Sequence, residues 1–110
     1  MDQAHGNIYA DLGESSAGEI FRDLLTAPHF KIERIVSMGQ ATPPGEWLDQ
    51  DRAEWVILLA GTAALLFEGD AALHPMKQGD YLLIPPHHRH RVEWTAQDEP
   101  TVWLAVHYDS

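Results

Sequence analysis

The chain has 110 residues, which is enough for one domain built around one hydrophobic core. Seventeen Asp and Glu against seven Lys and Arg give a formal net charge of -10, which disfavours binding to nucleic acid or to an anionic membrane surface. The chain has no cysteine, so disulfides and thiolate metal sites are excluded.

The apolar segments are short. No apolar run approaches the roughly 20 residues that a membrane-spanning helix needs, and the first residues, MDQAHGNIY, lack the basic and apolar regions of a secretory signal. We therefore expect a cytoplasmic protein that binds neither nucleic acid nor membranes.

Residues 1–28 are expected to form an N-terminal arm and a short helix. Ser16 and Glu19 have the spacing of a capping box. The apolar residues that follow fall on one helical face, namely Ile20, Phe21, Leu24 and Leu25. This spacing predicts a helix over about 17–25, which Pro28 ends.

From about residue 29 the period of the pattern changes to two. In HFKIERIVSM, Arg34 lies on the same side as the apolar Phe30, Ile32, Val36 and Met38. Further short apolar runs, such as EWVILLA, YLLI and TVWLAVHY, alternate with turns that contain Gly, Pro and Asp. Seven or eight such strands predict one all-β domain, a sandwich or barrel over about 29–110.

Two spaced motifs connect this pattern to a known family. Glu54 and Gly61 form E-x6-G, and Gly79, Pro85 and His90 form G-x5-P-x4-H, with about 20 residues of hairpin between the motifs. Residues 39–108, above all MKQGD and IPPHHRHRV, resemble the small single-domain cupins, some of which are labelled mannose-6-phosphate isomerase-like. The resemblance implies a jelly-roll barrel, a double-stranded β-helix.

The resemblance also implies a divalent metal. The first cupin motif usually reads G-x5-H-x-H-x3or4-E-x6-G, and its two histidines and glutamate join the second-motif histidine around one ion. Glu54 and His90 match this pattern. The places of the two first-motif histidines are taken either by Trp47 and Asp49 or by Leu48 and Gln50, and His87 replaces the usual second-motif glycine.

A barrel interior can bring together ligands that are distant in sequence, because inward positions on neighbouring strands point at one axis. Asp49, Glu54 and His90 would supply two carboxylates and one imidazole, with His88 as a fourth ligand if its turn folds inward. Such ligands suit Zn, Mn, Fe or Ni. The alternative is that Asp49 caps a turn, Glu54 bonds to His90, and the cavity holds only water.

His90 and Glu54 are the predicted catalytic residues. A histidine inside an apolar barrel needs a ligand or a partner, and Glu54 could orient His90 as a general base; a purely structural pair is the alternative. His87 and His88 follow a double proline, where a solvent-exposed histidine is common. His107 could face either way, because both faces of its strand are apolar.

Three further residues are predicted to contact the ligand. Arg34 could clamp a carboxylate or phosphate, unless a bulge turns it outward or Glu54 pairs with it. Trp47 and Trp94 could stack on a flat ring at the barrel mouth, although large aromatic residues often simply belong to the core.

The face opposite Glu54 predicts an interface. Trp55, Ile57 and Leu59 would form an apolar stripe on the outside of the barrel, which the N-terminal helix or a second subunit must cover. We expect a homodimer.

The favoured function is a metal-dependent isomerase or epimerase that moves a proton on a small polar metabolite, such as a sugar derivative. A non-enzymatic module that binds or senses a small molecule is the alternative, and a structural barrel with a degenerate site is the third.

Overall fold

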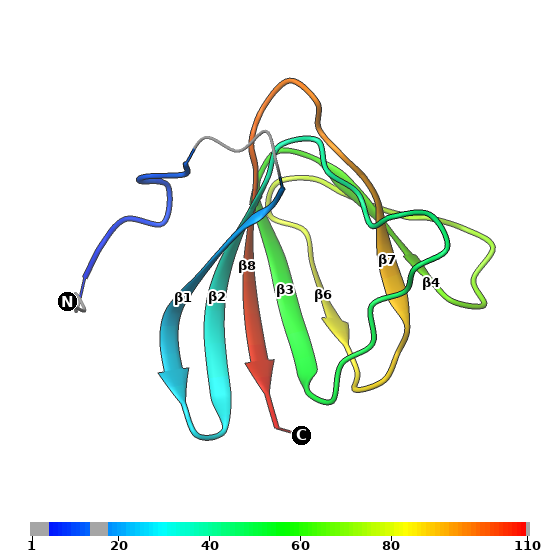
Figure 1. Cartoon of the computed structure of the whole chain (residues 1–110), viewed down its shortest axis with the longest axis horizontal. Coiled ribbons are helices and arrows are strands. Elements are labelled where there is room, and N and C mark those ends of the chain that lie inside the picture. The colour runs from blue at the N-terminus through cyan, green and yellow to red at the C-terminus, as the bar shows by residue number, and fades with distance from the viewer. Residues whose placement is uncertain (1–4, 14–17, 110) are drawn as a thin grey trace.

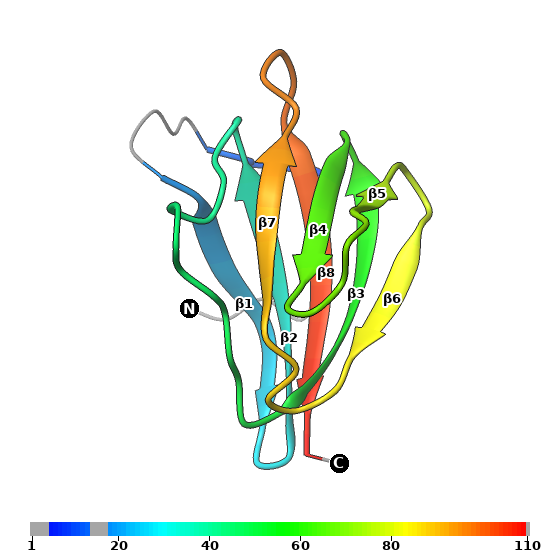
Figure 2. The ribbon, with the colours of Figure 1, turned by 90° about the vertical axis from the view of Figure 1, so that its right-hand side faces the viewer.

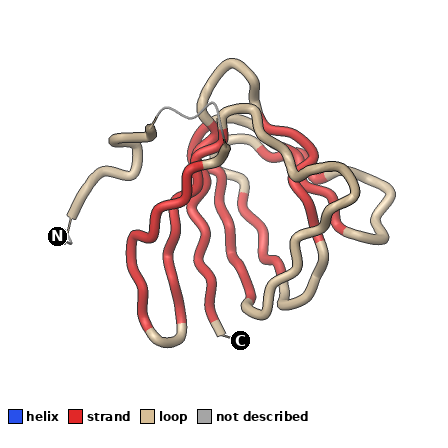
Figure 3. Tube along the Cα trace, viewed as in Figure 1, coloured by secondary structure: helices blue, strands red, loops and turns tan. Residues whose placement is uncertain are grey.

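The computed structural model describes residues 5–13 and 18–109, which form eight β-strands. The strands are β1 (Ile20–Ala27), β2 (Phe30–Ser37), β3 (Ala53–Ala60), β4 (Ala63–Phe67), β5 (His74–Met76), β6 (Tyr81–Ile84), β7 (His90–Thr95) and β8 (Thr101–Tyr108). Figure 3 shows strands and loops along the described trace, so the fold is all-β, as predicted. The described residues include no helix long and apolar enough to cross a membrane.

Two antiparallel sheets face each other (Figures 1 and 2). The large sheet has the strand order β1-β2-β8-β3-β6, and the small sheet has the order β5-β4-β7. From β3 onward the chain passes between the sheets, because β3, β6 and β8 lie in the large sheet while β4, β5 and β7 lie in the small one. This alternation produces the predicted jelly-roll arrangement.

The hydrophobic core lies between the two sheets. Successive side chains of a strand point to opposite faces, and the inward set on β3 and β8 includes Val56, Leu58, Trp103 and Ala105. Leu58 is fully buried, and burial of such a side chain contributes on the order of 2 kcal/mol to folding. The core therefore joins the large sheet to the small sheet.

The predicted helix over 17–25 is wrong, because Ile20–Ala27 form strand β1. Ser16, the predicted cap, lies outside the described residues. The helix-like spacing comes from an irregular strand, since the register of β1 against β2 shifts between Asp23 and Leu25. Pairing with β2 satisfies the backbone of β1, and this tertiary interaction outweighs a weak local propensity for helix.

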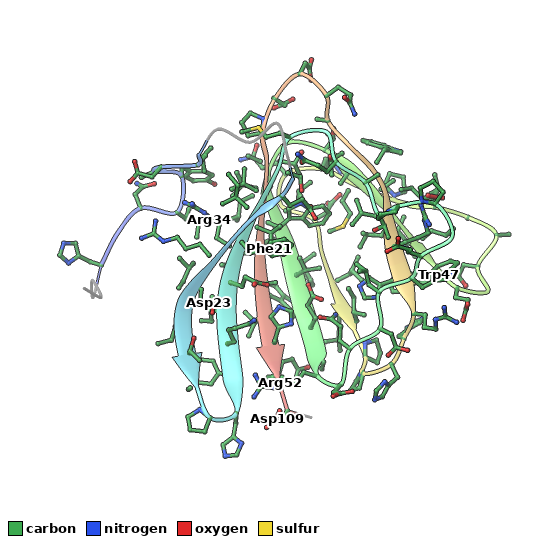
Figure 4. All side chains as sticks on the ribbon, viewed as in Figure 1. Phe21, Asp23, Arg34, Trp47, Arg52 and Asp109 are labelled. Atoms are coloured by element: carbon green, nitrogen blue, oxygen red, sulfur yellow. The ribbon has the colours of Figure 1, made fainter. Side chains whose placement is uncertain are left out.

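Arg34 of β2 points to the outer face of the large sheet, where the N-terminal arm, residues 5–13, contacts it (Figure 4). The residue is only 2% exposed. Its guanidinium donates hydrogen bonds to the carbonyl oxygens of Ile8 (3.3 Å), Ala10 (2.7 Å) and Asp11 (3.0 Å). Burial lowers the pKa of Arg34 from its ordinary value; the nearby positive charge of Arg22 lowers it further, and Asp11 opposes the shift.

Gly61, the glycine of the E-x6-G motif, lies where β3 turns into β4. Its φ is 83°, a left-handed conformation that favours glycine. A Cβ added here would lie 2.4 Å from the Thr101 Oγ1 atom and 2.8 Å from the Pro100 carbonyl oxygen. The motif therefore needs glycine for its conformation and for the close approach of β8.

We predict that Gly61→Ala lowers the free energy of unfolding by about 2–5 kcal/mol, because it adds a clash with backbone atoms to the conformational strain. Gly69→Ala is the matched control: its φ is 94°, but an added Cβ meets nothing within 4 Å. The control should lose only about 1–2 kcal/mol. Urea unfolding measures both losses, and equal losses would contradict the packing role of Gly61.

Candidate functional site

A cavity of about 350 Å³ lies between the two sheets. One wall is the inner face of the large sheet. The opposite wall is β7 together with the connection between β2 and β3, residues 38–52, which runs beside β7 (Figure 2). Leu48 in this connection exchanges two backbone hydrogen bonds with His90, of 2.7 and 3.1 Å. The apolar lining includes Ile35, Val56, Leu65, Ile84, Val92 and Trp103.

His90 is the first residue of β7, and its side chain lines the cavity with 3% exposure. The ring atom Nδ1 lies 2.9 Å from the carbonyl oxygen of His88. A carbonyl oxygen only accepts, so Nδ1 donates the hydrogen of this bond, and Nε2 is the ring nitrogen left to meet a ligand. Within residues 5–13 and 18–109, no group bonds to Nε2. The ring is therefore oriented by the backbone, and its second nitrogen can accept a proton.

Glu54, near the start of β3, also lines the cavity and is 8% exposed. Its Oε1 atom accepts a hydrogen bond of 2.6 Å from the side-chain amide of Gln50. The predicted hydrogen bond between Glu54 and His90 is not among the interactions of the described residues. The two side chains instead face one cavity from its two walls, each with its own partner.

A second pair of ionisable residues lies in the same cavity. His107 Nε2 and Glu33 Oε1 are 3.1 Å apart, and both residues line the cavity. In the register of the sheet, His107 of β8 lies directly opposite Glu54 of β3. Glu33, His107 and Glu54 thus form a row across three neighbouring strands, which we call the acid–base row.

The sequence contained a partial signal for this row. Trp103, Ala105 and His107 share one face of β8, so the burial of Trp103 fixes the direction of His107. The alternation of β2 placed Arg34 with the apolar residues, on the expected barrel side. The structure shows the opposite arrangement, because Glu33 lines the cavity while Arg34 faces outward.

The four predicted metal ligands do not come together. Asp49 lines the cavity, but its carboxylate is 2.9 Å from Nδ1 of His87. His88 lies outside the cavity, with its ring centre 4.5 Å from that of Phe67. No group of three or more His, Cys, Asp or Glu side chains in the described part of the chain is arranged to hold an ion. The donor set of the described residues therefore does not fit the metal of a usual cupin.

None of the three predicted pocket residues lines the cavity. Figure 4 labels Arg34 and Trp47 on opposite sides of the molecule. The Arg89 guanidinium lies 5.9 Å from the ring centre of Trp47. Trp94 was expected at the barrel mouth, on the same face of its strand as His90 by two-residue alternation, but a bulge shifts the register near Glu93. Trp94 is consequently 42% exposed.

The double-proline turn explains the remaining histidine. His87 has a φ of 60°, the left-handed region in which the usual cupin glycine is favourable. Its N–H donates to the Gln50 carbonyl oxygen at 2.8 Å, and its exposed ring contacts Asp49. The turn is thus fastened to the segment that also holds Glu54.

Comparisons with known proteins agree with this architecture. Residues 35–107 match the model of the family described as Cupin domain. A crystal structure from Ralstonia eutropha JMP134, provisionally named a mannose-6-phosphate isomerase, is 51% identical with a TM-score of 0.94, covering 98% of this chain and 100% of that one. A cupin superfamily protein from Desulfitobacterium hafniense DCB-2 has a TM-score of 0.76 at 16% identity, covering 100% and 95%, and supports the fold alone.

The curated relatives are longer proteins. Glucose-6-phosphate isomerase from Pyrococcus horikoshii is 39% identical over 61 residues, which are 53% of this chain and 32% of that protein. The chain therefore matches about a third of the length of these relatives. With the family model covering most of the barrel and the two sheets folded as a jelly roll, the chain belongs to the cupin family.

Proposed function

We propose that this cupin binds a small polar metabolite, such as a sugar derivative, between its two sheets and transfers a proton on it, as an isomerase or epimerase does. The observation that carries the proposal is the pair of facing groups in one cavity: Nε2 of His90 on one wall and the acid–base row on the other. The names of the Ralstonia and Pyrococcus relatives support the same reaction class.

The chemistry requires two proton-transferring groups that reach one substrate. A base removes the proton from the carbon next to a carbonyl, and the C–H bonding electrons form a C=C bond while the carbonyl oxygen takes up a proton, which gives an enediol. A proton is then delivered to carbon as one enediol hydroxyl loses its proton and becomes a carbonyl. Delivery to the former carbonyl carbon gives the isomer, and delivery to the other face of the original carbon gives the epimer. His90 supplies the base, because its Nδ1 is committed to a carbonyl and its Nε2 is open. Glu54 and His107 supply the returning proton from the sheet.

We predict that the protein exchanges the C–H proton next to the carbonyl of a sugar substrate with solvent deuterium, as followed by NMR for a panel of aldoses and ketoses. His90→Gln and Glu54→Gln should each slow the exchange by about 100-fold or more. His88→Gln is the control, since it keeps the backbone carbonyl that orients His90 and its own side chain lies outside the cavity. Equal exchange in His90→Gln and the unchanged protein would contradict the proposal.

The second candidate function is a non-enzymatic binding or sensor module. It is favoured by one observation, that the predicted metal ligands do not assemble. Thermal stabilisation by a metabolite without any proton exchange would support this candidate over the enzyme.

We predict that divalent metal is not needed for folding. An ion that binds the native state raises its stability. Asp49, Glu54 and His88 each contact a different residue, so they form no shared site for an ion. Treatment with a chelator, or addition of Zn, Mn, Fe(II) or Ni ions, should shift the melting temperature by less than about 1 °C. Stoichiometric metal that is lost in both Glu54→Gln and His90→Gln would overturn this expectation.

We further propose a homodimer through the outer face of the large sheet. The outer apolar face comprises Trp55, Ile57, Tyr81, Leu83, Leu104 and Val106, which the register sets opposite to the cavity side. Tyr81 and Leu83 are 66% and 51% exposed. Although the chain carries a net charge of -10, these neighbouring outward positions contain no Asp or Glu, so two copies can meet here without repulsion.

We predict a mass of twice 12.4 kDa by light scattering after size exclusion. Trp55→Ser should give the monomer mass, because it removes the aromatic centre of the face, where the Trp55 and Tyr81 rings are 5.5 Å apart. Trp94→Ser, an exposed tryptophan on β7, should leave the mass unchanged. A monomeric unchanged protein at micromolar concentration would refute the interface.

A further inference from the structure

We propose that the natural ligand of the cavity carries a positive charge, and that it is a small organic amine rather than a phosphorylated sugar. This inference rests on the proposed function only in using the same cavity. It begins from the charges of the lining, which includes five carboxylates and no Lys or Arg. The carboxylates belong to Glu19, Glu33, Glu46, Asp49 and Glu54.

The cations nearest to the cavity are already engaged. Lys31 lies 3.7 Å from Glu33 and 3.8 Å from Asp23. The Arg91 guanidinium bonds to Glu93 at 3.0 Å and to the carbonyl oxygens of Thr42, Pro43 and Glu46. Phosphate is normally held by a free Arg or Lys or by a helix N-terminus, and the described residues form no helix. A phosphorylated ligand would therefore meet a lining with five carboxylates and without a Lys or Arg to bind its phosphate.

The uncharged groups of the cavity point to the same ligand chemistry. His90 lines the cavity and is only 3% exposed. Its Nε2 atom, an acceptor, has no partner in the described structure. The side-chain amide of Gln50, a donor in the lining, bonds to Glu54. A cavity that offers acceptors needs a ligand that offers donors, and an ammonium group has three N–H donors and no acceptor.

The walls select for a compact ligand with an apolar part. The volume of about 350 Å³ corresponds to roughly a dozen water molecules at about 30 Å³ each, which suits a single ring or a short chain. Trp103 lines the cavity while its indole N–H bonds to Ser37 Oγ at 3.1 Å. Because its N–H is already bonded within the protein, the Trp103 ring can contact the cationic group or the apolar part of a ligand.

The test compares three probes that share one ring and differ in charge: cyclohexylamine, cyclohexanol and cyclohexyl phosphate. Calorimetric titration at about pH 8 keeps the amine cationic, and a chelator removes divalent ions. We expect the amine to bind about ten-fold or more tightly than the alcohol, and the phosphate to bind weakest. Added salt should weaken amine binding only modestly, because Glu33 and Glu54 are each only 8% exposed.

Variants identify the groups responsible. Glu54→Gln and Glu33→Gln should each lower the amine affinity by about ten-fold and change the alcohol affinity by less than about two-fold. Glu68→Gln is the matched control, because Glu68 lies outside the cavity and pairs with Arg89 at 2.9 Å. It should leave both affinities unchanged.

The proposal is overturned if the phosphate binds as tightly as the amine, if amine and alcohol bind equally, or if the amine shows no binding up to about 10 mM. None of the probes has a carbonyl, so the result does not depend on proton transfer. Selective binding of the amine without proton exchange on sugars would contradict the proposed enzymatic function and support the amine ligand. His90-dependent exchange on a sugar phosphate that outcompetes the amine would support the enzymatic function and contradict the amine ligand.

Discussion

The site depends on one pairing in the large sheet, the insertion of β8 between β2 and β3. Every residue of β8 has a partner on β2, and most have a second partner on β3. Because the side-chain period of a strand is two, a slip of one residue would turn Glu33 or Glu54 away from the cavity relative to His107. The acid–base row is therefore a consequence of register: three residues far apart in sequence share a face only because the last strand is held from both sides.

Much of this arrangement could be predicted from the sequence, and the failures have physical causes. Period-two alternation and turn residues predicted the all-β fold, and the spacing of Glu54 and His90 indicated the inner face of their strands. Alternation cannot detect an inserted residue, so the bulge near Glu93 reversed the expected direction of Trp94. It also describes two faces of a strand without saying which is inside. That is why Arg34 was assigned to the cavity and Glu33 was missed.

The reversal on β2 reflects what each face meets. Inner positions of a barrel are apolar where they pack, but Glu33 faces a cavity, where its carboxylate contacts His107; Lys31, outside the lining, lies 3.7 Å away. Arg34 on the outer face is not exposed to solvent, because the backbone carbonyls of the arm surround its guanidinium. A polar residue within an apolar stripe thus indicates that its side chain has a specific hydrogen-bonding partner, since burial of a charge requires hydrogen bonds wherever the charge lies. It does not indicate whether the side chain points into or out of the barrel.

The histidine-rich turn after β6 is held in place by residues 48–50. Leu48 pairs with the backbone of His90, and Gln50 uses its carbonyl to accept the His87 N–H and its side-chain amide to bind Glu54. One short segment therefore positions both walls of the site. His88 contributes a carbonyl and not an imidazole, and that carbonyl decides which nitrogen of His90 is free. In a usual cupin, histidines near these positions of the first motif hold a metal. Here the same stretch of chain acts through hydrogen bonds, which orient an imidazole and a carboxylate without bringing their ligating atoms to a common point. Chemistry at this site consequently depends on how well segment 48–50 holds the turn.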